Sequence, residues 1–133
     1  MAGPSHGAPA TRIERRGEDG QFTEEVAMGK YLFEAHYTAD GAKGIAKEGG
    51  SARRAAVEKS IASVGGRLEA FYFAFGGSDA IVIADLPDNI SAAAMALAVA
   101  QSGMATTKTV VLLSTEEMDA AGKKTVSYRA PGR

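Results

Sequence analysis

His36 has the side chain best suited to acid–base chemistry, because its imidazole changes charge near neutral pH. It is the sole histidine after residue 27. It could therefore act as a general base in a pocket, or it could be a hydrogen-bonded structural residue of a strand. No second ligand is suitably spaced and the chain has no cysteine, so the sequence predicts no metal site and no cofactor.

Three polar residues alternate along one side of the same segment: Lys30, Glu34 and His36. Such groups could line a small cavity, since barrel interiors and mouths often hold ligands. They could equally make hydrogen bonds across an interface. The sequence leaves both interpretations open.

Other polar motifs suggest structure more than catalysis. Asp79 and Asp85 lie in one extended segment, about 20 Å apart at ~3.4 Å per residue, which is too far for a carboxylate pair acting on one bond. The glycines and arginines of "EGGSARR" (48–54) could hold an anion at a helix N-terminus, or could simply cap the helix and face solvent. The motif lacks the lysine and spacing of a P-loop. We expect Met95, Met104 and Met118 to be packing residues.

The first half of the chain predicts a strand, a broken segment and a helix. Residues 30–37 alternate between apolar and polar side chains, which is typical of a strand. Glycines interrupt residues 38–50, where we expect a short turn of helix within a loop. Ser51 is a suitable N-cap for a helix that ends at Gly65 and Gly66.

The second half predicts a hairpin followed by a helix, a strand and a last helix. Strands at 67–75 and 79–86 flank a tight turn at 76–78. Asp88 or Asn89 caps a helix to Gly103, and 105–113 is rich in β-branched residues. Ser114 and Glu117 have the spacing of a capping box. The order predicts an α+β, ferredoxin-like βαββαβ fold with a four-stranded antiparallel sheet and a short C-terminal helix.

Two helices cover one face of such a sheet, and the other face needs a partner. Phe71, Phe73 and Phe75 share one side of a strand, and Ile81 and Ile83 share one side of the next. Burying one phenylalanine contributes about 1.5–3 kcal/mol, so a bare face with three of them favours self-association. We therefore expect a homodimer in which two sheets form an α/β barrel.

A ligand would then lie between the two sheets. The residues predicted to contact it are His36, Glu34, Phe71, Phe73 and Ile83.

Composition limits the partners. The net charge is −1, with 15 basic and 16 acidic residues, and no basic stripe carries the aromatics, so nucleic-acid binding is not expected. No apolar run reaches the ~20 residues that span a bilayer, and we expect a cytoplasmic protein. Residues 1–27, rich in glycine, proline and scattered charge, are expected to be a disordered arm before one domain at 28–133.

Several stretches together are similar to the GYD domain family of small bacterial proteins: "YTADGAKG", "EGGSARR", "FYFAFG" and "DLPDN". The resemblance covers about residues 29–132. It implies a dimeric α/β-barrel fold and carries no established activity. The Gly-Tyr-Asp tripeptide that names the family corresponds to Gly77, Ser78 and Asp79 here, so a role that depends on that tyrosine does not transfer.

Three functions remain open. The first is a homo-oligomeric barrel domain that binds a small apolar or aromatic molecule. The second is a cofactor-independent monooxygenase or isomerase that uses His36. The third is a structural or effector-sensing module that works through assembly alone.

Overall fold

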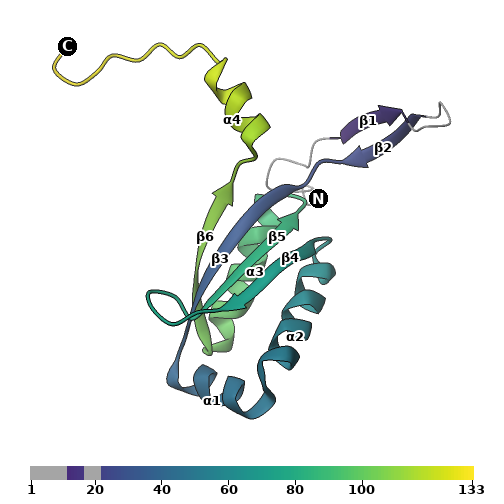
Figure 1. The fold of residues 1–133 in the computed structure, drawn as a ribbon, viewed down its shortest axis with the longest axis vertical. Coiled ribbons are helices and arrows are strands. Elements are labelled where there is room, and N and C mark those ends of the chain that lie inside the picture. The colour runs from purple at the N-terminus through teal and green to yellow at the C-terminus, as the bar shows by residue number, and fades with distance from the viewer. Residues whose placement is uncertain (1–11, 17–21) are drawn as a thin grey trace, which may run out of the picture.

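The computed structural model describes residues 12–16 and 22–133, and its main body is one sheet with helices on one face (Figure 1). In chain order the elements are β1 (Arg12–Arg16), β2 (Phe22–Val26), β3 (Gly29–Tyr37), α1 (Ala39–Glu48), α2 (Gly50–Ser63), β4 (Arg67–Phe73), β5 (Ala80–Leu86), α3 (Asn89–Ser102), β6 (Ala105–Leu112) and α4 (Thr115–Gly122).

The main sheet has the strand order β4-β5-β3-β6, and each neighbouring pair is antiparallel. Helix α2 packs against β4, and α3 packs against β5 and β6 on the same side (Figure 1). The opposite side of the sheet carries no element of the main body, and we call it the open face. The predicted α+β fold with a four-stranded antiparallel sheet is confirmed.

The hydrophobic core lies between the sheet and its helices. Its buried members come from alternate strand positions and from the two helices: Tyr31, Phe33, Ile61, Val82, Ala84, Leu86 and Ala92. Alternation places every second side chain of a strand on the same face. The pattern read for residues 30–37 therefore identified the buried side of β3 correctly.

The phenylalanines of β4 do not lie on the open face, contrary to the prediction. Phe71 pairs in register with the core residue Val82 and packs against the core. Phe73 pairs with Ala80, which is also buried. Phe75 lies beyond the end of β4 and is fully exposed. The prediction placed these side chains on the wrong face of the sheet. Alternation within a strand shows which side chains share a face, but it does not show which face the helices cover.

The glycine-broken segment forms a complete helix, α1, instead of a short turn within a loop. Thr38 caps it, accepting a hydrogen bond from the Gly41 amide at 3.1 Å. Gly41 is there because α1 passes close to the main chain of Met104, where a Cβ would lie 1.9 Å from the carbonyl oxygen. The glycine thus permits close packing and does not break the helix.

Helix α2 begins at Gly50, with Gly49 as its N-cap, so the predicted cap at Ser51 is wrong. Gly49 has φ of +93°, a backbone conformation that glycine adopts far more readily than other residues. This residue ends α1 and starts α2 within a single position, which leaves no room for a separate capping loop.

The hairpin between β4 and β5 has a wider connection than the predicted tight turn, since β4 ends at Phe73 and β5 starts at Ala80. Asp79 fixes the hairpin to β3. Its Oδ2 accepts a hydrogen bond from the Tyr37 amide at 2.8 Å, and its own amide donates to the Ala35 carbonyl oxygen at 2.8 Å.

Within the predicted N-terminal arm, the described residues form an antiparallel pair of strands, β1 and β2. The expected disorder of residues 1–11 and 17–21 lies outside the described residues. Among the described helices, none combines the length and the apolar character needed to cross a membrane. The cytoplasmic location stays a prediction.

Candidate functional site

A cavity of about 510 Å³ lies between the helix-covered face of the sheet and helices α1, α2 and α3. Its walls are mainly aliphatic and aromatic side chains, among them Phe33, Ile45, Val57, Phe71, Val82, Met95 and Val99. Pockets for small molecules in proteins commonly measure ~300–1,000 Å³ and have such walls. The cavity is therefore large enough for an aromatic molecule of one or two rings.

Polar groups gather where α1 meets α2. Arg53 donates a hydrogen bond from Nε to Glu48 Oε2 at 2.5 Å, and both residues line the cavity with Tyr37. This hydrogen bond lowers the pKa of Glu48, which stays charged. Among the described residues, the other guanidinium nitrogens of Arg53 make no hydrogen bond.

Tyr37 supplies a neutral hydroxyl to this group. Burial is the main cause that raises the pKa of Tyr37. The charge of Arg53 opposes the rise, whereas the carboxylates of Asp79 and Glu48 add to it. Tyr37 therefore keeps its proton at neutral pH and can donate or accept one hydrogen bond.

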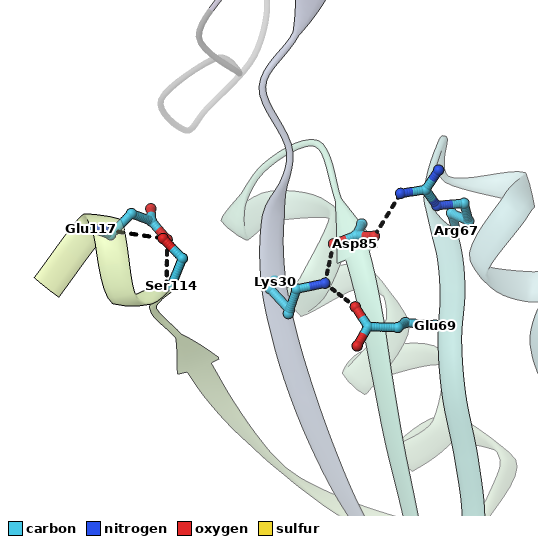
Figure 2. A network of polar contacts seen from close by, with 6 residues as sticks. All are labelled: Lys30, Arg67, Glu69, Asp85, Ser114 and Glu117. Atoms are coloured by element: carbon cyan, nitrogen blue, oxygen red, sulfur yellow. Dashed lines mark hydrogen bonds and ion pairs between the residues drawn. The ribbon is translucent and has the colours of Figure 1, made fainter.

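The open face carries an ionic network at one end (Figure 2). Lys30 on β3 donates to Asp85 on β5 at 2.8 Å and also contacts Glu69 on β4. Arg67 donates to the other oxygen of Asp85 at 3.1 Å. Two cations and two anions thus cancel at this end of the face.

The network also sets the charge states of its members. Burial by itself raises the pKa of Asp85, but the hydrogen bonds from Lys30 and Arg67 outweigh it and hold the pKa below its ordinary value. The hydrogen bond to Asp85, followed by that to Glu69, raises the pKa of Lys30. Both shifts favour the charged forms of Lys30 and Asp85, so their contact is a structural ion pair.

At the other end of the open face, the hairpin loop folds back onto β3. Ser78 Oγ donates to Glu34 Oε1 at 2.9 Å. His36 Nε2 contacts the carbonyl oxygen of Gly77, and His36 is exposed. Ser78 therefore bonds to Glu34, one of the predicted ligand residues.

The five predicted ligand residues are divided between the two sides of the sheet. Phe71 lines the cavity, and the ring of Phe73 lies beside it at 5.1 Å in an edge-to-face arrangement. Glu34, His36 and Ile83 lie on the open face, away from the cavity. The structure does not bring the five residues together in one pocket.

Sequence reasoning missed the polar end of the cavity. Tyr37 lies at the end of the alternating segment 30–37, but its place at a cavity depends on how far α1 and α2 stand from the sheet. Arg53 was considered for an anion site, and the short distance to Glu48 was not foreseen. Neighbouring charges of opposite sign in "EGGSARR" were the available signal.

In the described part of the chain, no group of three or more histidine and carboxylate side chains could hold a metal ion.

The fold and the cavity define an α+β protein with a small-molecule-sized space between its sheet and its helices. The chain belongs to the GYD domain family, whose model matches residues 31–121. Searches of curated proteins and of solved structures found no match.

Proposed function

We propose that this GYD domain is a homodimeric binding module that holds a small apolar or aromatic molecule in the cavity beneath α1, α2 and α3. The observation that carries the proposal is a 510 Å³ space with apolar walls and one polar end. The apolar walls supply affinity by removing ligand surface from water. Tyr37 and Arg53 at the polar end orient the ligand by hydrogen bonding.

The test is a titration with a neutral aromatic fluorophore, N-phenyl-1-naphthylamine, monitored by the rise in its emission. We expect saturable binding of one dye per chain. Ala98 lines the cavity from α3, and Ala98→Phe should weaken dye binding about tenfold or more by filling the space.

The matched control is Ala93→Phe on the same helix. Ala93 is exposed and does not line the cavity, so this variant should bind like the parent chain. Equal dye affinity for the Ala98→Phe and Ala93→Phe variants would contradict the proposed site, as would the absence of saturable binding by the parent chain.

The proposed partner is a second copy that packs on the open face. The middle of this face is apolar, formed by Leu32, Ala70, Tyr72, Ile81, Ile83, Val110 and Leu112. Tyr72 is 69% exposed, so a second copy on this face would cover much of its ring. A second copy would meet little net charge, because the flanking ionic network is neutral.

Ile83→Lys tests the dimer. Ile83 points to the open face, so a lysine there should leave the fold intact and turn a dimer into a monomer in sedimentation velocity. A monomeric variant that still binds the dye would also show that the ligand site lies within one chain. If the parent chain sediments as a monomer at all concentrations, the proposed dimer is wrong, and the cavity proposal remains to be judged by the dye titration.

A further inference from the structure

The last 21 residues form an extension that we call the C-terminal arm, residues 113–133. It contains α4 and the tail after it, and it leaves the sheet at the end of β6 and runs away from the main body (Figure 1). Every residue from 113 to 129 is exposed. The arm is thus built by this chain but not covered by it.

Helix α4 is well specified locally. Ser114 and Glu117 form both hydrogen bonds of a capping box, at 3.0 Å and 2.8 Å (Figure 2). Yet α4 has eight residues, and isolated helices of that length are marginal in water. A packing partner would supply the missing stability.

Apolar side chains along the arm are also left in solvent. Leu113, Met118, Val126 and Tyr128 are 55–76% exposed. Met118, expected from the sequence to be a packing residue, contacts no core. Their spacing along the whole arm indicates an extended contact surface and not a single anchor.

The charges of the arm are separated by sign. Helix α4 carries Glu116, Glu117 and Asp119, and the tail carries Lys123, Lys124, Arg129 and Arg133. None of these seven takes part in an ion pair between described residues. A segment that is acidic in its first half and basic in its second half is complementary to an antiparallel copy of itself.

Two copies related by a two-fold axis could bring the acidic half of each arm against the basic half of the other. In an isologous contact, residue i of one copy meets residue j of the other, and j meets i. The arm also follows directly after Leu112, which belongs to the open face, so it continues the surface on which the proposed second copy packs.

We propose that the C-terminal arms of two copies pair antiparallel across the dimer axis, with the acidic α4 of each arm against the basic tail of the other. This inference rests on the proposed homodimer. The arm pair would add a second contact to the sheet contact and cover Met118, Val126 and Tyr128.

A charge-swap experiment tests the pairing in the full chain. The acidic-arm variant carries Lys123→Glu, Lys124→Glu and Arg129→Glu. The basic-arm variant carries Glu116→Lys and Asp119→Lys and keeps Glu117 for the capping box. Each variant alone should self-associate about tenfold more weakly at low salt, because several exposed pairs at ~0.2–1 kcal/mol each become repulsive.

An equal mixture of the two variants should form heterodimers with close to the parent affinity, since each half of one arm then faces the opposite charge. The measurement is sedimentation velocity with one variant fluorescently labelled. Raising the salt to about 1 M should reduce the difference between mixture and single variants. A body variant with Lys43→Glu, Lys47→Glu and Lys59→Glu changes the net charge by the same amount as the acidic-arm variant and should dimerise like the parent.

Removal of residues 115–133 separates this inference from the dimer itself. A truncated chain that dimerises with the parent affinity overturns the arm pairing and leaves the sheet contact standing. Weakened but detectable dimerisation supports both contacts. A mixture no tighter than the single variants overturns the pairing, and a parent chain that never dimerises overturns the dimer and the arm pairing together.

Discussion

The two faces of the four-stranded sheet differ in what covers them, although the same strands supply both. On the helix-covered face, Tyr31, Phe33 and Val82 are buried under α2 and α3. On the open face, Leu32, Ile81 and Ile83 are partly buried by their neighbours alone. The chain therefore covers one face with its own helices and leaves the other face uncovered.

The comparison also separates two kinds of polar site. The polar groups next to the cavity, Tyr37 and Arg53, stand at the edge of an apolar space and can meet a ligand. Those of the open face, such as Lys30 and Asp85, are already bonded to one another. The proposed function therefore puts the ligand on the helix-covered side and the second copy on the open face.

The largest effect is expected when an isoleucine on the helix-covered side is compared with one on the open face. Ile61 on α2 is fully buried under the sheet, and Ile61→Ala should lower the free energy of unfolding by about 2–5 kcal/mol. Ile83→Ala, on the open face, should cost clearly less in a monomeric background such as one carrying Tyr72→Lys. Urea denaturation measures both. Equal decreases in the free energy of unfolding for the two variants would mean that the two faces are equally well packed.

Two glycines of α1, Gly41 and Gly44, test how closely this helix packs on the helix-covered side. A Cβ at Gly41 would overlap the Met104 carbonyl oxygen, so Gly41→Ala should cost about 1–3 kcal/mol. Gly44 lines the cavity with open space around it, and Gly44→Ala should stabilise the helix by about 0.5–1 kcal/mol. Thermal denaturation compares them. If Gly41→Ala is also stabilising, α1 does not pack on the chain at Met104.

The smallest effect concerns the ionic network of the open face. Asp85→Asn should lower the free energy of unfolding at pH 7 by about 1 kcal/mol, since its partners are largely exposed. The folded pKa of Asp85 lies below its ordinary 3.8, so its contribution is present above that pH and is lost as the pH falls through the folded pKa.

The difference in free energy of unfolding between the Asp85→Asn variant and the parent should therefore be constant above about pH 5. It should become smaller below about pH 4. Glu69→Gln is the matched control at a more exposed position of the same network. A difference that grows on acidification would contradict the assigned direction of the pKa shift.

Much of the fold was predictable because its signals are local. Alternation identified β3, the Asp88 cap identified the start of α3, and the capping box of Ser114 and Glu117 identified α4. Helix α1 was misjudged because glycine has two causes in a sequence, a helix break or a close approach, and only the position of Met104 distinguishes them.

The candidate site was less predictable. Phe71 was expected to face a ligand between two sheets, whereas it lines the cavity on the helix-covered side of its own sheet. Tyr37 and Arg53 come together at the cavity because α1 and α2 meet at Gly49, which no local pattern specifies.

By itself the sequence determined the order of β3, α2, β4, β5, α3, β6 and α4, the N-caps of α3 and α4, and the family to which the chain belongs, since each depends on neighbouring residues. Only the tertiary structure decided which strand face the helices cover, where the cavity lies and that the C-terminal arm stands clear of its own domain. These features depend on contacts between residues far apart in the chain, and the spacing of side chains along one strand is the same whichever face is buried.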